Sequence, residues 1–175
     1  SFDVSSPPWN DIHVRRAVSM AADKRGMLNA LFKGHGEVAT SLVAPQQWGG
    51  VLPQGQVRKL YATFPKLPYN LTLAKAEMKK SSVPNGFSAD LPYPNGVPVL
   101  GKMCLALAQT LEQLGIKLNV KEVTTDKWLN DLYAHQNLGI QVISFVPDYP
   151  DPINYPFVLL GDFRGSLITA AAIPF

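Results

Sequence analysis

The sequence predicts an α/β fold in which helices flank a mixed sheet, and three observations support it. A long amphipathic stretch, 99–114, lies between two segments of alternating apolar and polar residues, which is the order of a βαβ unit with parallel strands. Helical spacing that follows a capping residue recurs elsewhere along the chain. The 175 residues are 46% hydrophobic and 17% charged, a composition that supplies one sizeable core.

The first third of the chain predicts two helices and then an irregular segment. Asn10 or Asp11 is suited to cap the first helix and Asp23 the second, because their side-chain oxygens accept from unpaired backbone N–H groups. Gly34 is expected to end the second helix. The segment 37–68 has little periodicity and many prolines and glycines, so we expect a long, mostly irregular loop with a function or a partner surface.

The rest of the chain predicts alternating helices and strands. Asn70 or Thr72 is suited to cap a third helix, and Thr125 or Asp126 a last short one in which Trp128 faces the core. Strands are expected where apolar residues alternate, and the long helix between the first two ends at a glycine. The expected strands are 87–91, 116–121 and 140–145, and the last of them runs into a proline-rich turn.

Composition and residue spacing exclude several function classes. The formal charge of +3 comes from scattered lysines and arginines, so no nucleic-acid partner is expected. Cys104 is the one cysteine, so no intramolecular disulfide is possible, and its apolar helical context predicts a buried, inert thiol. The histidines have no metal-ligand spacing, and no apolar run reaches the length of about 18 residues that a membrane span needs. We expect no metal and no cofactor.

Three passages in order resemble the family 5 extracellular solute-binding proteins of bacterial ABC importers, which include oligopeptide-, dipeptide- and nickel-binding proteins. The passages are PPWNDIHVRRAVSMAADKRGML at 7–28, LAQTLEQLGIKLNVKEV at 107–123 and FVPDYPDPINY at 145–155. The resemblance implies lobe II of a type II, cluster C periplasmic binding protein. It implies a single lobe over residues 1–160, followed by a poorly matching tail at 161–175.

The same resemblance implies the partners and the location. The chain is expected to bind a peptide or similar small solute together with the first lobe of the same protein, and to present the closed form to ABC permease subunits. It is expected outside the bacterial cytoplasm, in the periplasm or on the cell surface. Contact with the membrane is expected only through a lipoprotein anchor of the precursor, and no enzymatic activity is expected.

Candidate ligand-binding residues gather where the last expected strand ends. Asp148 follows Phe145 by three positions and precedes Tyr149, at the strand end where open α/β sheets place ligands. In the family's peptide binders, an aspartate three residues after an aromatic pairs with the α-amino group of the ligand, a role that the resemblance gives to Asp148. The alternative is that Asp148 only forms a turn. Trp48, on a glycine-rich loop, is expected either to line the cleft or to hold its loop to the core.

Two other functions stay open from the sequence alone. Asp151, followed by proline, is expected to bond its own turn and is therefore not counted as a ligand residue. A stand-alone hydrolase would use Asp148 and Asp151 as acid and base, although nothing gives the two carboxyl groups distinct environments. A protein-interaction module would share the fold without a solute cleft.

Overall fold

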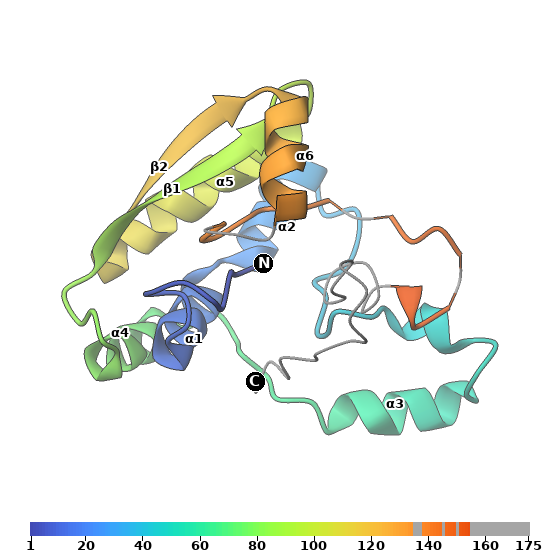
Figure 1. Ribbon diagram of the computed structural model, residues 1–175. Helices are drawn as coiled ribbons and strands as arrows, with labels where there is room; N and C mark the ends of the chain where they lie inside the picture. Colours follow the sequence, from blue (N-terminus) through green and yellow to red (C-terminus); the bar gives the residue numbers. More distant parts are fainter. Residues whose placement is uncertain (135–137, 145, 150, 155–175) are drawn as a thin grey trace. The chain divides into compact units, whose positions relative to one another are not determined.

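A computed structural model describes residues 1–134, 138–144, 146–149 and 151–154 (Figure 1). The chain divides into two compact units. The first unit contains residues 1–37 and 67–144, and the second contains 38–66 together with the chain from residue 145 onward. The predicted boundary at residue 160 lies outside the described residues and stays a prediction.

The first two helices begin where their capping residues predict. Helix α1 spans Ile12–Ala21, and Asp11 caps it by accepting from the backbone N–H of His13 at 2.8 Å. Helix α2 spans Lys24–Phe32, and Asp23 caps it by accepting from Gly26 at 2.8 Å. Helix α2 ends at Phe32, two residues before the predicted glycine Gly34, because Lys33 already adopts the left-handed conformation with φ of 53°.

The prediction of an irregular segment over 37–68 is wrong in its second half. The segment contains a short 3₁₀ turn, η1 (Pro45–Trp48), and a regular helix, α3 (Gln54–Ala62). Helical spacing was present, since Val57, Leu60 and Tyr61 lie at positions i, i+3 and i+4, and Val57 is fully buried. The surrounding prolines obscured it, although Pro53 sits just before the helix, where a missing N–H costs no hydrogen bond.

The βαβ unit forms as predicted and provides the sheet of the first unit (Figure 1). Its two strands are parallel, with Phe87 opposite Ile116 at the start of the register. The amphipathic helix between them ends in a 3₁₀ turn, after which Gly115 is left-handed with φ of 76°. The elements, with the helix that precedes them, are α4 (Leu71–Lys80), β1 (Phe87–Pro94), α5 (Pro98–Leu111), η2 (Glu112–Leu114) and β2 (Ile116–Val123).

The core of the first unit lies between the inner face of this sheet and the helices α5, α1 and α4. Helix α5 covers the sheet while α1 and α4 pack side by side (Figure 1). Trp9, 3% exposed, is the aromatic centre, and its ring meets Phe87 edge-on at 5.0 Å between centroids. Cys104 is fully buried as predicted, and burial raises the pKa of its thiol to about 11, so the group is a poor nucleophile.

The last described helix, α6 (Thr125–Ala134), begins one residue earlier than its predicted caps imply, since Thr124 Oγ1 accepts from the N–H of Lys127 at 3.3 Å. Trp128 is only partly buried, and its indole N–H donates to Gln141 Oε1 at 3.2 Å. It lies outside the main core cluster, contrary to the prediction.

The predicted strand 140–145 is absent from its described part, residues 140–144. Ile140 forms an isolated antiparallel bridge with Phe2, because Asp3 and Gln141 donate to backbone carbonyls across this pair rather than to the edge of the sheet. The helices and the parallel pair of β1 and β2 confirm the α/β class. Within the described residues, however, the named sheet has two parallel strands and is smaller than the mixed sheet expected.

Replacing Glu77 with glutamine is expected to lower the free energy of unfolding near neutral pH by about 0.5 kcal/mol. Glu77 on α4 accepts from Lys80 Nζ at 2.6 Å and faces His13 Nδ1 on α1 at 2.8 Å, and these contacts hold its pKa below the usual 4.5. A depressed carboxyl pKa stabilises the fold above the unfolded-state pKa, and the stabilisation is lost as pH falls through the folded-state value.

Urea unfolding near neutral pH and again in acid measures this effect. The wild type and Glu77→Gln should differ near neutral pH and converge in acid, whereas the exposed Glu112→Gln serves as a control with no such difference. An equal difference at both pH values would contradict the assignment to Glu77 ionisation.

Candidate functional site

In the described residues 146–149 and 151–154, polar side chains bond the backbone of their own segment. Asp151 Oδ1 accepts from the N–H of Ile153 at 2.9 Å, which confirms the prediction that Asp151 bonds its own turn. The N–H of Asp151 donates to the carbonyl of Tyr149 at 2.9 Å, and the N–H of Asn154 donates to the carbonyl of Asp151 at 3.2 Å.

Asp148 is exposed and contacts the buried Asn154 through both its backbone and its carboxylate. The backbone N–H of Asp148 donates to Asn154 Oδ1 at 3.1 Å, and Asn154 Nδ2 faces Asp148 Oδ2 at 3.5 Å. Asn154 is 1% exposed, whereas Asp148 is exposed. In the described part of the chain, Asp148 Oδ1 has no hydrogen-bond partner. The carboxylate is thus fixed on one side and open on the other.

The other predicted ligand residues are placed as follows. Tyr149 follows Asp148 in sequence and is 46% exposed. Phe145, the aromatic expected three positions before Asp148, lies outside the described residues. Trp48 belongs to the same compact unit but to a separate element, η1. The ligand role of these residues stays a prediction.

Trp48 is anchored through its indole nitrogen. Nε1 donates to the hydroxyl of Tyr61 on α3 at 3.0 Å, and that hydroxyl donates in turn to the carbonyl of Val43 at 2.5 Å. The chain of bonds ties the 38–52 stretch to α3, which is the loop-holding alternative among the two expectations for Trp48. The Trp48 side chain is half-buried.

Asn154 is the residue that the sequence analysis missed. Its sequence signal was an asparagine between two apolar residues, six positions after the candidate aspartate, in a passage without helical or strand periodicity. Such an asparagine is common in exposed turns, so its burial beneath Asp148 emerges only from the folded chain.

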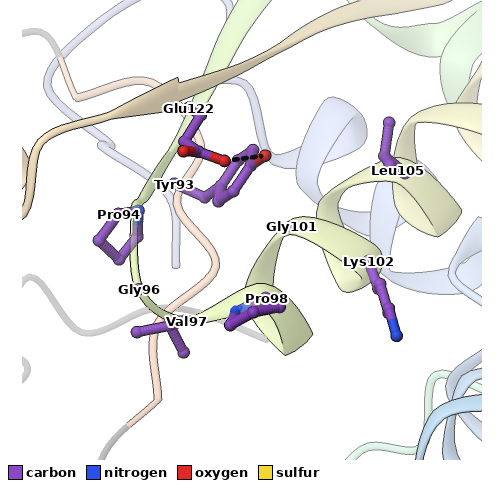
Figure 2. A pocket seen from close by; sticks show the side chains of 9 residues that line it. All are labelled: Tyr93, Pro94, Gly96, Val97, Pro98, Gly101, Lys102, Leu105 and Glu122. Atoms are coloured by element: carbon purple, nitrogen blue, oxygen red, sulfur yellow. Dashed lines mark hydrogen bonds between the residues drawn. The ribbon is translucent and has the colours of Figure 1, made fainter.

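A hollow of about 190 Å³ opens on the first unit at the carboxyl ends of β1 and β2 (Figure 2). Its most polar part is the pair Tyr93 and Glu122, in which the tyrosine hydroxyl donates to Glu122 Oε2 at 2.9 Å and this bond raises the pKa of Tyr93. Of the predicted ligand residues that the structure describes, namely Trp48, Asp148 and Tyr149, none lines it. The lining residues are Tyr93, Pro94, Gly96, Val97, Pro98, Gly101, Lys102, Leu105 and Glu122.

Metal chemistry has no candidate group in the part of the chain that the structure describes. Over residues 1–134, 138–144, 146–149 and 151–154, no three or more His, Cys, Asp or Glu side chains gather as ligands would. Among the same residues, no helix has both the length and the apolar composition of a membrane span.

Asp148 and Tyr149 are both exposed and follow one another in sequence. The family model for bacterial extracellular solute-binding proteins, family 5, middle region, matches residues 1–166. The chain belongs to this family. The resemblance stated from the three sequence passages is thereby confirmed.

Two relatives carry similar folds with bound peptides. The dipeptide-binding protein of Pseudoalteromonas sp. SM9913, solved with Met-Leu, superposes with a TM-score of 0.72 at 22% identity, covering 89% of this chain and 29% of that one. The periplasmic binding protein DppA of Helicobacter pylori, associated with an ABC transporter and solved with the peptide STSA, gives 0.76 at 18% identity, covering 91% and 28%. These likenesses show the fold.

A curated relative agrees in sequence. The di/tripeptide-binding protein 3 of Pseudomonas aeruginosa strain UCBPP-PA14 is 22% identical over 168 residues, covering 92% of this chain. The chain spans 29% of the length of that relative. Because the family consists of solute-binding proteins, the expectation that the chain is not an enzyme is confirmed, and the hydrolase alternative is dropped.

Proposed function

We propose that this chain is the second lobe of a peptide-binding protein that serves an ABC importer, with residues 1–160 forming the lobe and 161–175 its tail. The lobe is that of a type II, cluster C binding protein, and its sheet becomes a larger mixed one in the full-length protein. It closes over a peptide held with the first lobe. The permease then receives the closed form, on the outer side of the cytoplasmic membrane, where a lipid anchor of the precursor holds the protein.

The exposed carboxylate of Asp148 carries this proposal. It is followed by Tyr149 in sequence; its Oδ2 faces Asn154, and among the described residues its Oδ1 has no hydrogen-bond partner. A carboxylate so placed pairs with a cation, and the α-amino group of a peptide is the cation that every peptide with a free N-terminus presents. The bound peptides of the two structural relatives support this choice of ligand.

Calorimetric titration of the full-length protein with Met-Leu and with Ser-Thr-Ser-Ala tests the proposal. Saturable binding is expected, together with a raised thermal midpoint, because a ligand that binds only the folded state stabilises it. N-acetyl-Met-Leu, which lacks the ammonium group, should bind at least about tenfold more weakly. Failure of a broad panel of peptides to bind or to shift the midpoint would leave the protein-interaction module as the better account.

A further inference from the structure

Asn154 joins the two ends of the turn that carries Asp148. Its side chain spans six positions of sequence to reach the backbone N–H of Asp148 at 3.1 Å, and it is itself 1% exposed. Its own N–H bonds the carbonyl of Asp151 at 3.2 Å, so the main chain beneath the side chain is fixed as well. Because the amide atoms Oδ1 and Nδ2 of the buried Asn154 each face a partner, the amide has one orientation.

The donor and acceptor atoms of the Asn154 amide determine which of them faces the Asp148 carboxylate. A backbone N–H is a donor only, so the Asn154 atom that it reaches must be the oxygen Oδ1. The amide nitrogen then points to Asp148 Oδ2, at 3.5 Å, and an N–H donor at this place attracts the ionised oxygen. The contact restrains the rotation of the carboxylate and leaves Oδ1 for a ligand. Asp151 Oδ1, in contrast, accepts from the N–H of Ile153 in its own turn.

We propose that Asn154 is a positioning residue for ligand binding: it orients the Asp148 carboxylate toward the ammonium group of a bound peptide without touching the peptide itself. The inference rests on the proposed function, since it needs Asp148 to be the residue that binds the amine. It adds a specificity determinant, because Asn154 favours solutes with a free amino terminus over solutes without one.

The test compares Met-Leu with N-acetyl-Met-Leu on the full-length protein. Asn154→Leu keeps the branched shape and the number of heavy atoms of the side chain and removes both polar atoms, so the affinity for Met-Leu should fall about tenfold while that for N-acetyl-Met-Leu changes by less than about twofold. Asn154→Ser, which is too short to reach Asp148, should give the same selective loss if the leucine variant folds poorly. The thermal midpoint of each ligand-free variant establishes that it is folded.

A matched control exists on the first unit. Asn119 Nδ2 donates to Asp90 Oδ1 at 3.2 Å on the exposed face of the sheet, so Asn119→Leu removes the same kind of asparagine–aspartate contact from residues that are not part of the candidate site. It should leave both affinities unchanged.

The double variant Asp148→Asn with Asn154→Leu separates positioning from an independent contribution. It should bind Met-Leu no more weakly than Asp148→Asn alone, because a residue that acts through Asp148 has nothing left to position. Equal losses for both ligands, or additive losses in the double variant, would overturn the role of Asn154. If Asn154→Leu bound Met-Leu with wild-type affinity, the role of Asn154 would be wrong while the proposed function stood. If the wild-type protein bound no peptide, both the role of Asn154 and the proposed function would be wrong.

Discussion

Replacing Asp148 with asparagine in the full-length protein is expected to weaken the binding of Met-Leu about 100-fold, since a charge-assisted contact shielded from water contributes about 1.5–3 kcal/mol. Asparagine keeps the shape of the side chain but removes its charge, so the ammonium group of the ligand would be buried without a counter-ion. Because the loss concerns the ammonium alone, the affinity for N-acetyl-Met-Leu should be unchanged. Titration calorimetry with both ligands measures the difference.

Asp151→Asn is the matched control for this experiment. It makes the same change three positions away in the same turn, and the asparagine oxygen still accepts from the N–H of Ile153. Its affinity for Met-Leu should stay within about twofold of the wild type, because the carboxylate of Asp151 bonds its own turn rather than the ligand. If the two variants lost affinity equally, the effect would belong to the net charge of the turn and not to Asp148.

Local signals predicted the parts of the fold that depend on neighbouring residues. The caps Asp11, Asp23 and Asn70 were found because a side chain that bonds a backbone N–H two or three positions on needs no tertiary partner. The βαβ unit was found because the apolar faces of its helix and strands repeat at their own periods. These interactions depend on residues that lie close together in the sequence.

Tertiary context decided the rest. The segment 140–144 has the alternation of a strand, yet its backbone bonds the chain around Phe2, which lies more than a hundred residues earlier. Trp9 is in the core cluster and Trp128 is outside it, although helical spacing favoured the latter. Asn154 was missed for the same reason, since only burial distinguishes a supporting asparagine from one in an exposed turn.

Gly86→Ala is expected to destabilise the protein by about 3 kcal/mol or more, a large share of the roughly 5–15 kcal/mol that holds a domain folded. Gly86 and Gly115 directly precede the paired residues Phe87 and Ile116 at the start of the parallel strands. A Cβ on Gly86 would lie 2.0 Å from the carbonyl oxygen of Gly115, which is backbone and cannot rotate away. Relief would require the two strands to separate where their register begins.

Gly96→Ala separates this steric effect from the cost of backbone conformation. Both glycines have positive φ, 88° at Gly86 and 79° at Gly96, so alanine is strained at either position by about 1–2 kcal/mol. A Cβ on Gly96 meets nothing within 4 Å, so no clash is added there. In urea unfolding, Gly96→Ala should lose only the conformational cost and Gly86→Ala clearly more. Equal losses would mean that the strand starts move apart easily, and the close approach of the two turns would then not be what fixes the register of β1 and β2.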